Sequence, residues 1–187
     1  MRAGLWILVR VVICALVLSL PGQAAAIEKI AAGRASIEVA FSPWDDAEAL
    51  LTGTISGAQR QILVQAFLLT SRTFAFSLID AKLRGVEVMV LADARQHADT
   101  PGSLLDLLSQ HGIPVWLETR FRHAHNKIVV IDADEKDNKS EVAPVVISGS
   151  YNFTWGAQHM NAENLIVIRN HLVLAGRFAR NWRRHQQ

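Results

Sequence analysis

The sequence predicts an α/β fold, in which helices pack against a central sheet. Short apolar, β-branched runs alternate along the chain with segments whose apolar residues recur at helical spacing, and turn residues separate the two. The chain is 50% hydrophobic. The length that follows residue 26 is enough for one hydrophobic core and too short for two. We therefore expect a single domain over residues 27–187.

The first half of this domain is expected to hold three strands and two helices. Ser42 is expected to cap the first helix, with Pro43 at its first position. Thr70 or Ser71 is expected to cap the second helix, which Gly85 ends in the left-handed conformation. The second strand is apolar almost throughout, which indicates burial on both faces. The expected strands are 37–41, 61–68 and 86–91, and the helices run from Ser42 toward Ile55 and from Ser71 to Gly85.

The second half continues the alternation. Thr100 and Pro101 predict the start of a leucine-rich helix that stops at Gly112, and the charged stretch 133–143 is expected to be a surface hairpin loop. The expected strands are 113–117, 127–131, 145–148 and 163–168, and helices are expected after Asn152 and over 171–184.

The first 26 residues are predicted to be a secretory signal peptide. Arg2 and Arg10 flank an apolar stretch, and residues 21–26 supply a helix breaker followed by small residues of the Ala-x-Ala kind. An uncleaved membrane anchor is the alternative, although Arg10 and the short apolar length disfavour a span. The sequence thus predicts a periplasmic or secreted protein with no stable membrane association after cleavage.

The charge of the mature chain does not by itself indicate a polyanion as its partner. Removal of Arg2 and Arg10 lowers the number of basic residues from 19 to 17, which equals the 17 acidic residues. Attraction for nucleic acid must therefore come from local clusters, such as Arg120 with Arg122 or the arginines near the C-terminus. The single cysteine, Cys14, lies in the signal segment, so the mature chain offers neither disulfides nor thiolate metal ligands.

One group of polar residues suggests phosphodiester chemistry. His125, Lys127 and Asp132 stand in the order His-x-Lys-x-x-x-x-Asp, and Ser150 and Asn152 follow after the polar loop. Residues two apart in a strand share a face, so His125 and Lys127 point the same way. A neutral imidazole can attack phosphorus, an ammonium can hold the phosphoryl oxygens, and the serine and asparagine add neutral hydrogen-bond donors.

These elements resemble the phospholipase D superfamily, and specifically its small single-motif bacterial nuclease branch. The resemblance includes the His-Lys-Asp motif, the Gly-Ser-x-Asn element at Gly149 and the later segment 161–164, and it extends from about Ile37 to Asn170. It implies a layered fold with a central mixed sheet flanked by helices. It also implies that this open sheet collects His125, Lys127, Ser150, Asn152 and Glu163 at strand ends.

The resemblance further implies a mechanism without metal or cofactor. One motif histidine attacks to form a phosphohistidine, and a second one acts as general acid and then as base. No other histidine here is followed two residues later by lysine, so the second must come from another copy in a homodimer. Glu163 matches the acid that orients the histidine. Asp132, an odd number of residues from His125, is expected to support the site structurally.

The sequence also contains candidate metal ligands and candidate aromatic platforms for bases. His123 and His125 share a strand face and could hold a metal, but no third ligand accompanies them at convincing spacing. Phe121 and Trp155 could stack on bases or be buried, whereas burial is favoured for Trp116.

The function expected from the sequence is a metal-independent phosphodiesterase, specifically a non-specific endonuclease that cleaves DNA, with RNA left open as a substrate. A phospholipase D-type lipid phosphodiesterase is the alternative, for which the sequence offers no clear amphipathic membrane-binding surface beyond the signal. A second alternative is a nucleic-acid-binding protein without activity.

Overall fold

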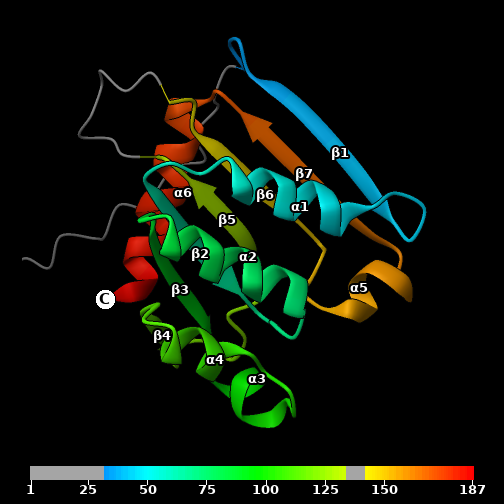
Figure 1. Ribbon diagram of the computed structural model, residues 1–187, viewed down its shortest axis with the longest axis vertical. Coiled ribbons are helices and arrows are strands. Elements are labelled where there is room, and N and C mark those ends of the chain that lie inside the picture. The colour runs from blue at the N-terminus through cyan, green and yellow to red at the C-terminus, as the bar shows by residue number, and fades with distance from the viewer. Residues whose placement is uncertain (1–31, 134–141) are drawn as a thin grey trace, which may run out of the picture.

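The computed structural model describes residues 32–133 and 142–187, and over these it has the predicted α/β architecture (Figure 1). A seven-stranded sheet with the order β1-β7-β6-β5-β2-β3-β4 forms the centre. The strands are β1 (Ser36–Ser42), β2 (Gln61–Ala66), β3 (Glu87–Asp93), β4 (Val115–Glu118), β5 (Lys127–Ile131), β6 (Val145–Gly149) and β7 (Glu163–Arg169). The helices are α1 (Ala47–Ser56), α2 (Arg72–Leu83), α3 (Ala94–Asp99), α4 (Leu105–Gln110), α5 (Trp155–His159) and α6 (Leu172–Gln186).

The sheet is mixed, as expected. β2, β3 and β4 are parallel to one another, whereas β5, β6, β7 and β1 are joined by antiparallel pairing. This register brings one end of every strand to a common edge, where Ala66 pairs with Lys127 and Ser42 pairs with Glu163. We call this edge the Lys127 edge. It also holds Gly149, Asp93 and Glu118.

Each face of the sheet has its own hydrophobic core. Alternate side chains of β2 and β5, such as Val64 and Val129, point to the face covered by α1, α2 and α4. The residues between them, such as Leu63 and Val130, point to the opposite face, where α6 packs (Figure 1). Trp182 of α6 is buried there, and its indole N–H donates to the Val64 carbonyl oxygen at 2.8 Å. β2 is therefore buried on both faces, as its composition predicts.

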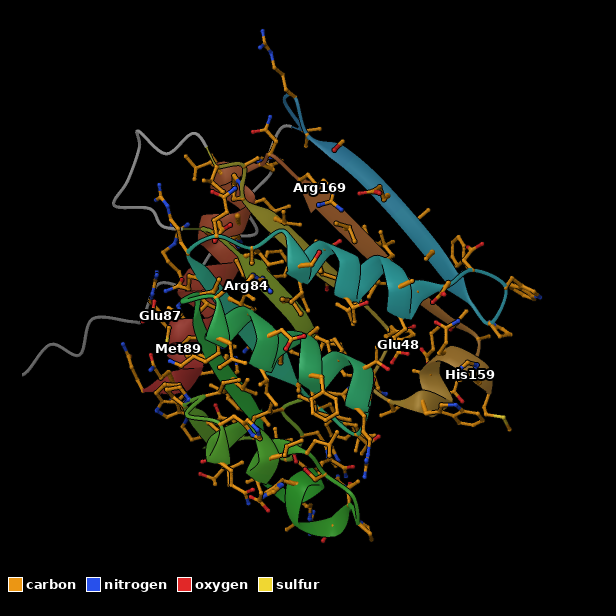
Figure 2. The ribbon with its side chains drawn as sticks, in the orientation of Figure 1. Glu48, Arg84, Glu87, Met89, His159 and Arg169 are labelled. Atoms are coloured by element: carbon orange, nitrogen blue, oxygen red, sulfur yellow. The ribbon has the colours of Figure 1, made fainter. Side chains whose placement is uncertain are left out.

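The edge of the sheet opposite the Lys127 edge is tied together by Arg169 (Figure 2). Its guanidinium forms an ion pair with Glu38 of β1 at 2.6 Å and donates a hydrogen bond to Thr54 of α1 at 3.0 Å. This side chain thus joins two strands and a helix at the end of the sheet remote from the predicted motif.

The prediction for the start of the first helix is wrong. α1 begins at Ala47 and is capped by Asp46, whose carboxylate accepts from the Ala49 N–H at 2.9 Å. Ser42 cannot serve as the cap because it still belongs to β1, and its hydroxyl donates to the Ala157 carbonyl oxygen at 2.6 Å. The serine therefore fastens β1 to α5.

Other boundaries also differ from expectation. β2 ends at Ala66 and not at residue 68, and the helix after Asn152 begins only at Trp155, capped by Thr154. The helix expected from Thr100 begins at Leu105, because the N–H of Leu104 first donates to Leu69 and holds the chain in a turn. α3 was not predicted at all. The caps at Ser71 and the left-handed Gly85 (φ +92°) are confirmed.

Within the two described ranges, no helix combines the length and the apolar character that crossing a membrane requires. The predicted signal segment and residues 134–141 of the expected hairpin loop lie outside those ranges.

Candidate active site

His125 and Lys127 are in direct contact at the Lys127 edge. The ammonium nitrogen of Lys127 lies 2.9 Å from Nδ1 of His125 and donates to the His125 carbonyl oxygen at 2.8 Å. Phe67, just beyond the end of β2, supports both groups: its ring centroid is 4.2 Å from that of the imidazole and 4.8 Å from the ammonium. The imidazole is exposed, whereas the lysine side chain is buried. The pair thus presents one accessible ring over a fixed positive charge.

This environment shifts both groups toward their neutral forms. Burial lowers the pKa of Lys127 from its ordinary value of 10.5 to about 8, and nearby Glu163 opposes the shift. Desolvation also lowers the pKa of His125, assisted by the positive charges of Lys127 and His123 and opposed by Asp93. A lowered pKa leaves more of the imidazole neutral at neutral pH, which is the form that can act as a nucleophile.

The loop that carries His125 is fixed by Asp93, a residue that was not among the site residues predicted from the sequence. This buried carboxylate lies at the end of β3, accepts from the Ala124 N–H at 2.6 Å, and caps α3 through the N–H of Gln96. An aspartate at the carboxyl end of a buried parallel strand is a signal that could have identified it.

Ser150 lies in a turn held against β7. Its hydroxyl oxygen accepts from the backbone N–H of Asn164 at 3.1 Å, and its own N–H donates to the Asn164 carbonyl oxygen. Gly149 makes this approach possible, because a Cβ there would lie 2.2 Å from that carbonyl oxygen and the φ of +157° also disfavours a side chain. The glycine of the motif therefore sets the position of the serine.

Asn152 follows in the same turn and carries an unused hydrogen-bonding atom. Its side-chain Oδ1 is buried, yet it has no hydrogen-bond partner among the described residues. Buried polar atoms are normally paired, so an unpaired one in a site calls for a partner. If the side-chain amide is flipped, its N–H₂ group takes the place of Oδ1 and can donate a hydrogen bond to a phosphoryl oxygen.

Glu163 lies at the same edge, at the start of β7, but its carboxylate accepts a hydrogen bond from Asn161 at 3.0 Å. No hydrogen bond joins Glu163 to His125 in the described part of the chain. Its influence on the pair is electrostatic, because its negative charge favours the charged form of Lys127.

Asp132 follows the other end of β5, away from His125 and Lys127. Its carboxylate accepts from the N–H groups of Gln59, Arg60 and Gln61 at 2.8 to 3.0 Å. These bonds fasten the start of β2 to the end of β5, the two strands that support Phe67 and Lys127 at the Lys127 edge.

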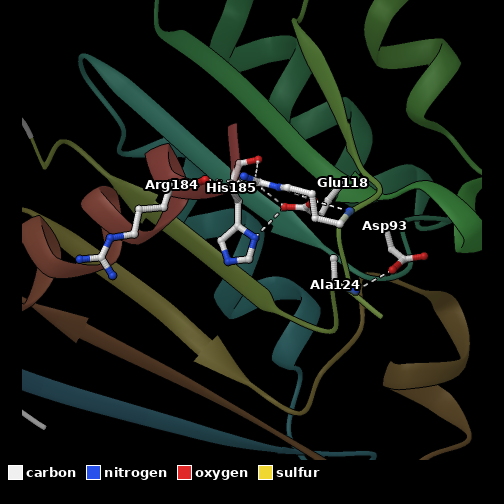
Figure 3. A network of polar contacts seen from close by, with 6 residues as sticks. Asp93, Glu118, Ala124, Arg184 and His185 are labelled. Carbon is white, nitrogen blue, oxygen red and sulfur yellow. Dashed lines mark hydrogen bonds and ion pairs between the residues drawn. The ribbon is translucent and has the colours of Figure 1, made fainter. Parts of the chain in front are cut away.

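The basic residues beside the motif divide into two kinds. Arg120 forms an ion pair with buried Glu118 at 2.8 Å and donates to the carbonyl oxygens of Arg184 and His185 at the end of α6. His185 contacts the same carboxylate at 2.9 Å (Figure 3). The Arg120 hydrogen bonds lower the pKa of Glu118 from 4.5 to about 2. Both arginines are exposed, but Arg120 is used to dock α6, whereas the side chain of Arg122 makes no ion pair within the described residues.

The remaining sequence candidates are spread around the site. Trp116 is partly buried against Trp182, whereas Phe121 and Trp155 are both exposed. His123 stacks edge-on against Phe67. No group of three or more His, Cys, Asp or Glu side chains within residues 32–133 and 142–187 is arranged to hold a metal ion.

A mixed sheet with a His-Lys pair and a Gly-Ser turn at one edge is the arrangement of phosphodiesterases of the phospholipase D type. The family model described as "Cardiolipin synthase, PLD-like domain" matches residues 51–185. The chain therefore belongs to the phospholipase D superfamily and is a phosphodiesterase, a hydrolase, of that superfamily.

Individual relatives support this membership. The chain is 33% identical to a phospholipase D of Rickettsia prowazekii over 149 residues, which cover 80% of this chain and 67% of the relative. It is 28% identical to a mitochondrial cardiolipin hydrolase of Xenopus laevis over 74% of this chain and 62% of that protein. Among solved structures, NUC, a phospholipase D family member from Salmonella typhimurium, superposes with a TM-score of 0.73 at 30% identity, over 81% of this chain and 94% of NUC.

Proposed function

We propose that this protein is a metal-independent endonuclease that cleaves DNA through a phosphohistidine intermediate at a site shared by two copies of the chain. The observation that carries the proposal is the contact between His125 and Lys127 at an open edge of the sheet. It joins an accessible imidazole to a cation that can hold phosphoryl oxygens, and the sequence holds this pair once.

The chemistry has two steps. His125 of one copy attacks phosphorus, the bond from phosphorus to the leaving oxygen breaks, and His125 of the second copy gives its proton to the departing alkoxide. Water then attacks the phosphohistidine, the second histidine takes the proton of that water, and the bond from phosphorus to nitrogen breaks. Lys127 and the Ser150 and Asn152 side chains stabilise the charge on the phosphoryl oxygens in both steps.

In the free protein the neutral imidazole of His125 carries its proton on Nε2, whereas attack through Nε2 requires the proton on Nδ1. Donation from the Lys127 ammonium to Nδ1 leaves the proton of the neutral ring on Nε2, and an Nε2 that carries a proton cannot attack. Binding of a phosphate draws the ammonium toward the phosphoryl oxygens and frees Nδ1. Water then takes the proton from Nε2 and delivers one to Nδ1. The new Nδ1–H donates a hydrogen bond to Glu163 in place of the bond from Asn161, and the unprotonated Nε2 becomes the nucleophile.

The second histidine comes from a symmetric dimer. A twofold axis at the Lys127 edge brings the same strand ends of both copies together, because an isologous interface uses one surface twice. The unpaired Oδ1 of Asn152 and the exposed ring of His125 are consistent with a site that is completed from outside one chain. We also propose that residues 1–26 direct export to the periplasm or the medium and are removed.

One observation favours the lipid phosphodiesterase as a second candidate. The sequence suggested no apolar membrane-binding surface after the signal, yet four large apolar side chains are exposed where β1 meets α5: Phe41, Trp44, Trp155 and Met160. Trp44 is 83% exposed. Such side chains beside a site can insert into a lipid interface, and the same surface can serve as a contact between two copies.

One assay separates these functions. Purified protein of residues 27–187 is expected to cut plasmid DNA in the presence of EDTA, His125→Ala is expected to abolish cutting, and His111→Ala, at an exposed histidine beyond α4, is expected to leave it intact. Hydrolysis of phosphatidylcholine or cardiolipin vesicles without DNA cleavage would establish the lipid function instead. A strict requirement for a divalent metal would contradict the mechanism, and DNA binding without cleavage would indicate the inactive binding protein.

A further inference from the structure

We propose that a cleft between the ends of β3 and β4 binds a nucleotide that flanks the scissile phosphate in single-stranded nucleic acid. Its base stacks on Phe121, and its phosphate contacts Arg95 and Arg122. This inference rests on the proposed nuclease function and adds to it a binding site outside the His-Lys pair.

The cleft has a volume of about 310 Å³, at the lower end of the range for small-ligand pockets. Its lining combines cationic, aromatic and hydroxyl groups: Asp93, Ala94, Arg95, Glu118, Thr119, Phe121 and Arg122. Cations together with an aromatic face are the groups by which proteins bind single-stranded nucleic acid without reading its sequence.

The two carboxylates of the cleft are already occupied. Glu118 is held by Arg120 and His185, and Asp93 accepts from two backbone N–H groups. Neither Arg95 nor Arg122 has a hydrogen bond or ion pair in the described part of the protein, and both are exposed. The uncompensated charge of the cleft is therefore positive, which suits a phosphate.

Phe121 has one side available for a base. Its ring centroid lies 5.2 Å from that of His185, which supports one side of the phenyl ring, and the side chain is 53% exposed. It belongs to neither hydrophobic core. An exposed ring that is supported from behind is a stacking platform, and every base offers it a π face.

The cleft is close enough to the His-Lys pair to bind the same strand. Arg122 and His125 are three positions apart in the sequence, so their Cα atoms lie at most about 11 Å apart. Asp93 fixes the intervening loop through its bond to Ala124 (Figure 3). The cleft and the histidine therefore keep one relative position, and a strand bound at both places is aligned across the reacting phosphorus.

This combination favours a nucleic acid over a lipid. A lipid headgroup would use the arginines but has no flat ring to stack on Phe121. The exposed cluster of Phe41, Trp44, Trp155 and Met160 lies instead at β1 and α5, across the sheet from β4. A contribution of the base to the binding affinity, separate from that of the phosphate, thus distinguishes a nucleotide from a lipid headgroup in this cleft.

The test measures binding of a fluorescein-labelled oligothymidylate to full-length mature protein that carries His125→Ala, so that the probe is not cut. Phe121→Ala is expected to weaken binding about tenfold, and Phe121→Trp to restore it. Arg122→Gln is expected to weaken binding and to lower the slope of log affinity against log salt by about 0.7, the value for one lost phosphate contact. Arg34→Gln is the matched control, because Arg34 lies just before β1 at the end of the sheet remote from the Lys127 edge. It should change neither the affinity nor the salt slope.

An oligonucleotide with abasic positions separates stacking from charge. It is expected to bind the Phe121→Ala protein and its Phe121 parent equally, because the ring then has no base to contact. Equal affinity of all variants for oligothymidylate would overturn the nucleotide cleft and leave the nuclease proposal standing. Absence of any oligonucleotide binding by the parent, with binding to cardiolipin vesicles, would overturn both.

Discussion

The ammonium of Lys127 lies 2.9 Å from Nδ1 of His125, so the proposed phosphoryl-binding charge and the proposed nucleophile are already in contact in the free protein. Both groups are supported by one aromatic ring, that of Phe67. The coupling makes the protonation state of the lysine a determinant of activity.

Replacement of Lys127 is expected to reveal this dependence on pH. Because the pKa of Lys127 is about 8, the ammonium is charged below that pH and loses its charge above it, so kcat/KM should fall on the alkaline side. Lys127→Met should lower kcat/KM by about 10²-fold or more below pH 8 and by progressively less above it, where the wild-type lysine is itself uncharged. Lys127→Arg keeps the charge, and its alkaline decline should move upward. An identical alkaline decline in the wild type and Lys127→Arg would show that another group controls it.

Gly149→Ala is expected to destabilise the protein and displace Ser150. The new Cβ would lie 2.2 Å from the Asn164 carbonyl oxygen, and neither backbone can move without breaking the pairing of β6 with β7. We expect a loss of at least about 2 kcal/mol of unfolding free energy, measured by urea denaturation. Gly53→Ala in α1 is the control, since nothing lies within 4 Å of its added Cβ and alanine favours the helix. Similar stabilities for the two variants would contradict the packing described for the Gly-Ser turn.

The sequence predicts the strand that carries the motif better than it predicts the hydrogen bonds around the site. The strand that carries it is found over Lys127–Ile131 as expected, because a β-branched run that is buried on both faces has few alternatives. The bond from Glu163 to Asn161 and the link from Asp93 to Ala124 could not be foreseen, because they depend on side-chain positions that spacing does not determine.

Contacts between distant parts of the chain were the hardest to anticipate. The sequence offered two candidate clusters for attracting nucleic acid, the arginines near the C-terminus and Arg120 with Arg122. The structure separates these two residues, because Arg120 forms an ion pair with Glu118. The same guanidinium donates to the carbonyl oxygen of Arg184 in α6, 64 residues further along the chain. The predicted start of α1 at Ser42 is wrong for a related reason: the Ser42 hydroxyl donates to the carbonyl oxygen of Ala157, a residue far along the sequence.

Glu118 is expected to give the fold an acid-sensitive component. Its pKa in the folded state, about 2, is below the ordinary 4.5, so its stabilising effect is complete above pH 4.5 and disappears as the pH falls through 2. Glu118→Gln should therefore lower the unfolding free energy by about 3 kcal/mol at pH 7 and by progressively less below pH 4.5. Glu87→Gln, at an exposed carboxylate, is the control. A stability difference between Glu118→Gln and wild type that does not vary with pH would refute the charged contact.

Asp132 is expected to matter for stability more than for chemistry. Asp132→Ala removes the acceptor for three N–H groups and places alanine at a φ of +54°, so a loss of about 3 kcal/mol or more is expected. Asp132→Asn should lose less, because asparagine keeps one oxygen and tolerates this conformation. Thermal unfolding and the kcat of the folded protein at low temperature measure the two effects. A kcat lost in Asp132→Asn at unchanged stability would assign this residue to catalysis.

The shared site is tested most directly by mixing wild-type and His125→Ala subunits in varied proportion, with exchange between copies allowed to reach equilibrium. If each active site needs two copies of His125, DNA cleavage falls with the square of the wild-type fraction, so that equal amounts give about one quarter of full activity. If each chain carries a complete site, activity falls in proportion and equal amounts give about one half, which would contradict the two-histidine mechanism.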